Sequence, residues 1–64
     1  MVLILDDHPI ARQGLASLIE LHFPQKEISQ AGTVREAKEE VQKEKAEVAF
    51  IDLNLGAESG FDFL

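Results

Sequence analysis

Two short, uninterrupted apolar runs stand out along the chain, at residues 2–5 and 48–51. Four apolar positions in a row, without polar alternation, are typical of parallel strands that are covered on both faces. A third strand is expected over residues 27–31, where polar residues are mixed with apolar ones. Because its pattern is half polar, this third strand is predicted to lie at an edge of the sheet.

The segment between the expected strands 2–5 and 27–31 has the spacing of a helix. Pro9 is tolerated in a first helical turn, and either Asp7 or His8 before it can act as the cap. The helix should end at Phe23-Pro24, because the residue before a proline avoids the helical region. The helical spacing predicts a stripe made of Ala11, Leu15, Leu18, Ile19 and His22, with Ile10 and Gly14 on its flank.

A second helix is expected after residue 33. Thr33 and Glu36 have the Thr-x-x-Glu spacing of a capping box, in which each side chain bonds the other end of the first turn. The narrow apolar stripe that follows consists of Val34, Ala37 and Val41.

Strands that alternate with helices predict an α/β fold with a parallel sheet. The half-polar strand 27–31 belongs at the edge, and the apolar strands 2–5 and 48–51 belong beside each other. The expected order across the sheet is therefore 27–31, 2–5 and 48–51. The direction of winding reverses at strand 2–5, which makes the sheet doubly wound. Right-handed crossovers then place the two helices on opposite faces.

Composition excludes several kinds of site. The chain has 64 residues, no cysteine and a net charge of −6. Thiolate metal sites and a cysteine nucleophile are therefore excluded, and the lack of cysteine fits a reducing cytoplasm. The acidic balance repels phosphate backbones, so we expect no direct contact with nucleic acid. No apolar run approaches the ~18 residues of a membrane span, so no membrane partner is expected.

Three acids follow the two apolar strands. Asp6 and Asp7 come directly after the first, and Asp52 comes directly after the third. In sheets of this kind ligands bind beyond the carboxyl ends of the strands, where the winding reverses. Three carboxylates in one crevice favour a hard divalent cation such as Mg²⁺ or Mn²⁺, and the main-chain oxygen of Asn54 is a candidate further ligand. A carboxylate can also act as a nucleophile and form an aspartyl-phosphate.

Taken singly, these residues also have simple structural interpretations. An acid pair after a strand is often a helix-capping turn, and a lone aspartate such as Asp52 often only begins a loop. His8 follows two acids and precedes a proline, so we interpret it as a solvated loop residue and not as a metal ligand. His22 lies near the end of the first helix, where positive charge is favourable, and implies no chemistry.

Together the motifs resemble the receiver domain of bacterial two-component response regulators, and most closely the subfamily with a helix-turn-helix DNA-binding output domain. The residues that carry the resemblance are Leu3-Ile4-Leu5-Asp6-Asp7-His8-Pro9, Gly14-Leu15, Val48-Ala49-Phe50-Ile51-Asp52-Leu53-Asn54-Leu55 and Ser59-Gly60. The spacing from the acid pair to Asp52 is that of the family. The resemblance covers the whole chain.

The resemblance implies a role for each acid. Asp52 would be the phosphoacceptor, and Asp7, Asp52 and the main-chain oxygen of Asn54 would bind Mg²⁺ directly. Asp6 would act mainly through water. The phosphoryl donor would be a phosphohistidine on a sensor histidine kinase, and the intact protein would be a cytoplasmic transcription regulator. Such a domain is a phosphoacceptor with self-catalysed transfer, not an enzyme with a separate substrate.

The chain also departs from the family. Gly56 stands where the family usually has a proline, which relaxes the loop. The family's flavodoxin-like fold has five strand-helix units, so residues 1–64 are expected to be the N-terminal part of the domain, truncated after the third strand. The family's hydroxyl residue and lysine of the later strands have no counterpart here, and we therefore expect weak phosphorylation.

Two other interpretations remain open. A phosphatase of the haloacid dehalogenase type also uses an aspartate at a strand end, but it needs an acid two residues later, where this chain has Asn54. Alternatively, the chain is a non-catalytic half-domain that self-associates, or binds a partner, through the open edge of strand 48–51. Phe61, Phe63 and Leu64, in the first turn of an expected third helix, would add apolar surface.

Overall fold

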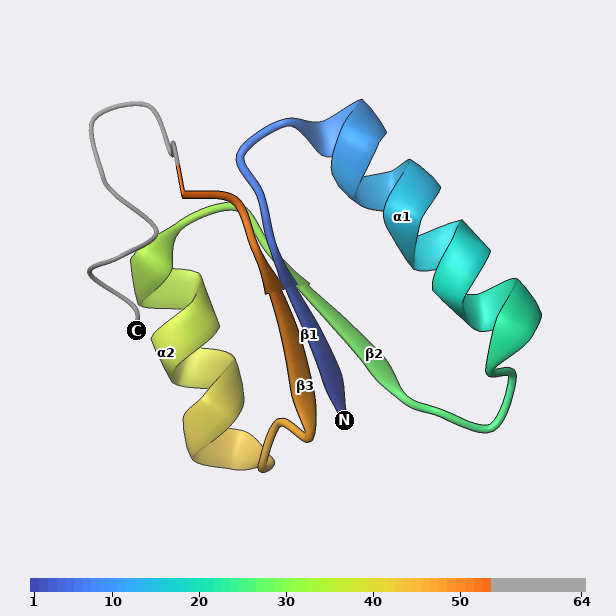
Figure 1. Ribbon diagram of the computed structural model, residues 1–64. Coiled ribbons are helices and arrows are strands. Elements are labelled where there is room, and N and C mark those ends of the chain that lie inside the picture. The colour runs from blue at the N-terminus through green and yellow to red at the C-terminus, as the bar shows by residue number, and fades with distance from the viewer. Residues whose placement is uncertain (54–64) are drawn as a thin grey trace.

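A computed structural model describes residues 1–53 of the chain (Figure 1). The elements follow the predicted strand-helix alternation, and the second strand begins one residue later than expected. In chain order they are β1 (Val2–Leu5), α1 (Pro9–His22), β2 (Ile28–Ala31), α2 (Val34–Lys43) and β3 (Val48–Ile51).

The three strands form one parallel sheet in the order β2-β1-β3, which confirms the predicted order. Leu5, the last residue of β1, lies opposite Ala31 of β2 on one side and Ile51 of β3 on the other. The carboxyl ends of all three strands therefore lie at the same edge of the sheet. The residues that follow β1 and β3 leave the sheet as neighbours.

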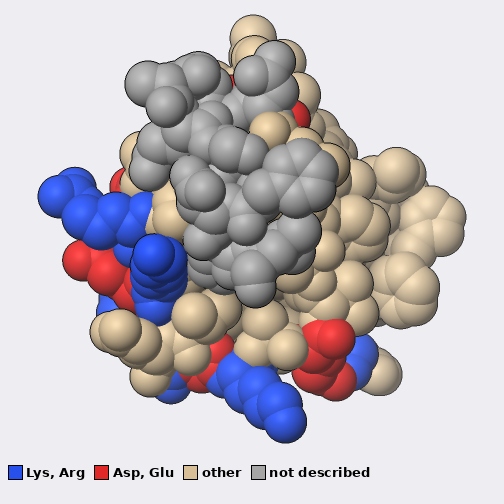
Figure 2. Space-filling view, turned by 60° about the vertical axis from the view of Figure 1, so that its left-hand side comes forward, with Lys and Arg blue, Asp and Glu red and all other residues tan. Residues whose placement is uncertain are grey.

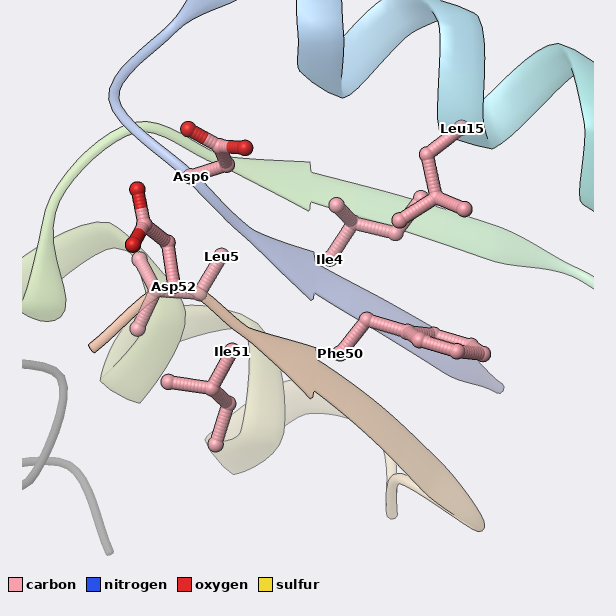
Figure 3. A pocket seen from close by; sticks show the side chains of 7 residues that line it. All are labelled: Ile4, Leu5, Asp6, Leu15, Phe50, Ile51 and Asp52. Carbon is pink, nitrogen blue, oxygen red and sulfur yellow. The ribbon is translucent and has the colours of Figure 1, made fainter. Parts of the chain in front are cut away.

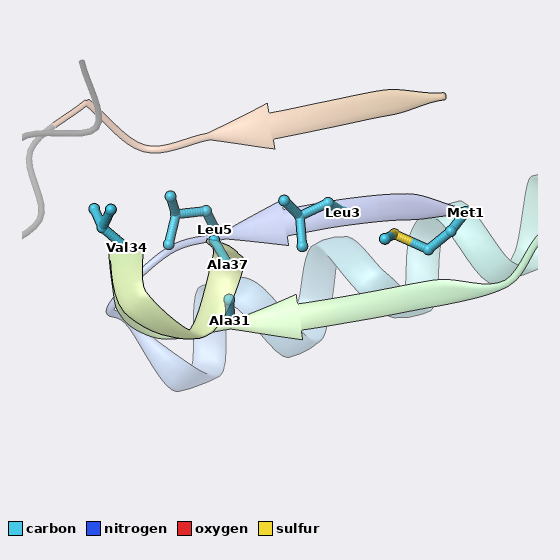
Figure 4. Packing of buried hydrophobic residues seen from close by; sticks show 6 residues of the cluster. All are labelled: Met1, Leu3, Leu5, Ala31, Val34 and Ala37. Atoms are coloured by element: carbon cyan, nitrogen blue, oxygen red, sulfur yellow. The ribbon is translucent and has the colours of Figure 1, made fainter. Parts of the chain in front are cut away.

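The helices cover opposite faces of the sheet, as predicted (Figure 1). Successive side chains of a strand point to opposite faces, so β1 supplies both cores. The core on the α2 side consists of Met1, Leu3, Leu5, Ala31, Val34 and Ala37 (Figure 4). The core on the α1 side consists of Val2, Ile4, Ala16 and Ile19.

The predicted stripe of α1 is partly wrong. Ile19 is buried and Leu15 packs against the core, but Ala16 is buried in place of Ala11, and Leu18 is 54% exposed. Adjacent helical residues lie about 100° apart around the axis, so burying Ile19 turns Leu18 away from the sheet. Apolar residues occur on more than one side of α1, and the pattern alone therefore does not define which side faces the sheet.

Helix α2 begins as its capping motif predicts. The hydroxyl oxygen of Thr33 accepts a hydrogen bond from the backbone N–H of Glu36 (3.1 Å). The Glu36 carboxylate reaches back one residue further than in a capping box and accepts from the N–H of Gly32 (2.8 Å). The expected stripe is confirmed for Val34, Ala37 and Val41.

Strand β3 carries exposed apolar side chains. Val48 is 50% exposed and Phe50 is 43% exposed, and in the described part of the chain β3 pairs only with β1. On the surface in Figure 2, charged side chains gather at the left and along the bottom, and the middle of the right-hand side is formed by other residues. The predicted open edge is therefore present among residues 1–53. The expected helical turn at Phe61, Phe63 and Leu64 lies outside the described residues.

No helix among the described residues is long and apolar enough to cross a membrane.

Candidate functional site

The carboxyl ends of β1 and β3 bring the three predicted acids together. The Asp6 N–H donates to the carbonyl of Ala31 (3.0 Å), and the Asp52 N–H donates to the carbonyl of Leu5 (2.8 Å). These hydrogen bonds continue the pairing of the sheet by one residue beyond the strands. One ligand atom from each of Asp6, Asp7 and Asp52 lies within 4.8 Å of the others, as the sequence predicted.

The same cluster contains His8, which was interpreted from the sequence as a solvated loop residue. Its side chain is 67% exposed, but its Nδ1 atom lies between the acids. The distances from Nδ1 are 2.8 Å to Asp6 Oδ1, 3.0 Å to Asp7 Oδ1 and 3.5 Å to Asp52 Oδ2. The interpretation of His8 as merely solvated is therefore incomplete. Its place directly after the acid pair was the only signal in the sequence.

The charges of this cluster shift two pKa values. A hydrogen bond to Asp6, and then the negative charges of Asp7 and Asp6, raise the pKa of His8 above its ordinary value of 6.5. Burial raises the pKa of Asp6, but hydrogen bonds from the His8 backbone and ring, with the ring's charge, outweigh burial and leave that pKa below its ordinary value. The imidazolium of His8 thus offsets part of the negative charge of the acids.

Asp7 is the member of the cluster whose surroundings best suit a cation. Among the described residues, its Oδ1 is the only buried side-chain oxygen or nitrogen that accepts no hydrogen bond. The nearest ring nitrogen, Nδ1 of His8, is hydrogen-bonded to Asp6. Oδ1 of Asp7 thus has the ion pair with that nitrogen (3.0 Å) but no hydrogen bond, and a hard cation such as Mg²⁺ prefers carboxylate oxygens as ligands. The donor set of carboxylate oxygens therefore fits Mg²⁺ or Mn²⁺.

A hollow of about 250 Å³ opens beside these acids (Figure 3). Asp6 and Asp52 stand at one end of it, at the tips of β1 and β3. Ile4, Leu15 and Phe50 supply its apolar lining. The hollow leaves room for a ligand group to approach the carboxylates from the α1 side.

One contributor to the site was missed by sequence analysis. Arg12, in α1, donates from Nη1 to the main-chain carbonyl of Asp6 (2.7 Å). No motif marks this residue, because the contact depends on how α1 lies against the sheet.

His22 lies at the other end of α1, where its Nδ1–H donates to the Leu18 carbonyl (3.0 Å), in agreement with a structural role. Asn54 and Gly56 lie outside the described residues.

Comparisons with known proteins agree with this geometry. A family model described as the response regulator receiver domain matches residues 2–64. The chain is similar to the sensory transduction protein LytT of Enterococcus faecalis, with 43% identity over 61 residues, which are 95% of this chain and 25% of that protein. It is also similar to the nitrate/nitrite response regulator protein NarP of Escherichia coli, with 35% identity over 63 residues, which are 98% of this chain and 29% of that protein.

The chain spans about a quarter of the length of these curated relatives. No solved structure gives a significant match.

Proposed function

Because the chain belongs to the family of response regulator receiver domains, we propose that Asp52 is the phosphoacceptor of a two-component signalling protein. The observation that carries the proposal is the meeting of Asp52 with Asp6 and Asp7 at the carboxyl ends of two neighbouring strands. Its side chain is accessible and borders the hollow, so a donor can reach its oxygens. The phosphoryl donor is a phosphohistidine of a sensor histidine kinase.

The proposed reaction is a direct transfer. A carboxylate oxygen of Asp52 attacks phosphorus and forms a new O–P bond. The P–N bond to the donor imidazole breaks, and the departing nitrogen takes up a proton. The domain accepts the phosphoryl group on its own Asp52 side chain. It is therefore a signalling module and not an enzyme with a separate substrate.

The divalent cation is proposed to be Mg²⁺, which Mn²⁺ can replace. Asp7 supports this assignment best, because its buried Oδ1 accepts no hydrogen bond in the described structure. Asp52 would be a second direct ligand, and Asp6 would act through water. The main-chain oxygen of Asn54, outside the described residues, completes the proposed set. When bound, the cation neutralises charge on the incoming phosphoryl group.

The matched segment is proposed to be one part of a longer protein. Residues 1–64 are proposed to correspond to the N-terminal part of a receiver domain. The intact protein would be a cytoplasmic transcription regulator, with DNA bound by a separate output domain. The similarity to LytT and NarP, of which the matched segments make up 25% and 29%, supports this extent.

Treatment with acetyl phosphate and Mg²⁺, followed by intact-mass measurement, tests the acceptor. We expect slow addition of one phosphoryl group to the 64-residue chain, and none in Asp52→Asn. Glu39→Gln removes an exposed acid of α2 and serves as the matched control, which should be labelled like the wild type. Equal labelling of Asp52→Asn and the wild type would refute the assignment.

A second candidate function is supported by β3. Its exposed Val48 and Phe50 favour a half-domain that self-associates through this strand, without chemistry. Sedimentation velocity at micromolar concentrations should then show an association that Phe50→Lys weakens. A monomer at all concentrations, with normal labelling of Asp52, would exclude this alternative.

A further inference from the structure

Arg12 links the acid cluster to two other parts of the fold. Its half-buried side chain extends from α1 to the carboxyl end of the sheet. Nη1 donates to the main-chain carbonyl of Asp6 (2.7 Å), and Nε donates to the side-chain oxygen of Gln30 in β2 (3.2 Å). A single guanidinium thus joins α1, β2 and the first residue of the acid cluster.

The contact with Asp6 lies at the point where the sheet ends. β1 ends at Leu5 and the Asp6 N–H still pairs with β2, so the Asp6 carbonyl is the first group beyond that pairing. The Asp6 N–H is bound by Ala31 and its carbonyl is bound by Arg12, so the peptide groups on both sides of its Cα are held. The second of these peptide groups leads directly into Asp7. The hydrogen bond from Arg12 therefore limits how both carboxylates can be directed.

The guanidinium is itself fixed in its plane. Its planar fork carries several donors in a rigid arrangement, and two of them, Nη1 and Nε, are bound to different elements. The amide of Gln30 is oriented in turn by a hydrogen bond to the side-chain oxygen of Gln13 (3.3 Å). Lysine offers no such fork and cannot reproduce both contacts.

Gly32 leaves the space that the guanidinium occupies. A Cβ atom at this position would lie 3.0 Å from Arg12 Nη1 and 3.4 Å from Glu36 Oε1. The 3.0 Å contact is shorter than an ordinary van der Waals contact, so one of the two groups must move. The flexible end of the arginine side chain is the group that can. A methyl group at residue 32 therefore shifts the Arg12 guanidinium by a few tenths of an ångström, and none of its three nearest atoms belongs to Asp6, Asp7 or Asp52.

We propose that Arg12 is a positioning residue of the cation site. By holding the Asp6 carbonyl, it keeps the Asp6 and Asp7 carboxylates in the arrangement that binds a divalent cation, and Gly32 leaves the room for it to do so. This inference rests on the proposed function only in that the three acids are taken as the cation site.

Titration with Mn²⁺, followed by water-proton relaxation, tests the proposal on the 64-residue chain. Arg12→Met and Arg12→Lys should each weaken Mn²⁺ binding by about tenfold, as outer-shell changes at metal sites commonly do. Gly32→Ala should weaken it in the same direction by a smaller factor. The matched control is Arg35→Met, which removes the same charge from an exposed position on α2 and should change the affinity less than about twofold.

The unfolding midpoint in urea, measured without metal, separates positioning from general stability. We expect Gly32→Ala to weaken Mn²⁺ binding while its midpoint stays close to that of the wild type. Wild-type affinity in Arg12→Lys would overturn the proposal, because the two contacts of the guanidinium would then not be needed. Equal affinities of Arg12→Met and Arg35→Met, or of Gly32→Ala and the wild type, would overturn it as well.

A wrong assignment of the cation site would give a different result from a wrong assignment of Arg12. If the wild type binds Mn²⁺ and Asp7→Asn does not, the site is established and the Arg12 and Gly32 variants decide the inference. If Asp7→Asn binds Mn²⁺ as tightly as the wild type, the proposed cation site is wrong, whatever the Arg12 variants show.

Discussion

The Oδ1 atom of Asp6 accepts two hydrogen bonds from His8, one from its backbone N–H (2.9 Å) and one at its ring Nδ1 (2.8 Å). The first closes a turn immediately after β1. The second brings the ring nitrogen to within reach of Asp7 and Asp52 as well. The imidazole of His8 therefore occupies the space between the carboxylates that a cation would share.

Replacing His8 should strengthen cation binding. His8→Ala removes the positive group that competes for the carboxylates, and its exposed ring contributes little packing. We expect the Mn²⁺ dissociation constant to fall by up to about tenfold. His22→Ala, at the far end of α1, is the control. Weaker binding in His8→Ala would mean that the ring is a ligand and not a competitor.

The metal-free protein should show a raised pKa for His8, because the hydrogen bond to Asp6 and the charges of Asp7 and Asp6 favour the imidazolium. A raised folded-state pKa adds stability that is fully present below pH 6.5 and is lost as the pH rises through the raised value. Titration of the ring signals by NMR measures this pKa. Asp6→Asn should lower it, and a wild-type pKa at or below 6.5 would contradict the structure.

Loss of the α2 cap should destabilise the fold. Thr33→Ala removes the acceptor for the Glu36 N–H, and we expect a loss of about 1 kcal/mol in the free energy of unfolding. Thr33→Ser keeps the hydroxyl and should retain most of the stability. Urea denaturation followed by circular dichroism gives both values. Equal losses in the two variants would show that the methyl group matters and the cap does not.

The centre of the sheet should tolerate truncation poorly. Leu3 is fully buried in the core on the α2 side, and Leu3→Ala should lower the free energy of unfolding by about 2–5 kcal/mol. A domain of this size has a total stability of only about 3–10 kcal/mol, so much of the protein should unfold. Leu18→Ala, at a half-exposed position of α1, should cost less than about 1 kcal/mol. Similar costs for the two variants would contradict the assigned core.

The two helices show how far apolar spacing predicts structure. Helix α2 carries one narrow stripe on a charged background, so Val34 and Ala37 could point only one way, and their burial was predicted. Helix α1 has apolar residues on more than one side. Its rotation was decided by packing of Ala16 and Ile19 against Val2 and Ile4 of β1, which no local pattern records.

The sequence by itself determined the order of the elements, the order of the strands and the meeting of Asp6, Asp7 and Asp52. These follow from apolar runs and from the rule that parallel strands end at one edge, which need only local information. The tertiary structure alone decided that His8 Nδ1 lies among the acids and that Arg12 holds the Asp6 carbonyl. The first depends on the conformation of the turn after β1 and on the pairing of β3 beside it. The second depends on the placement of α1 against the sheet, which arises only when separate elements pack together.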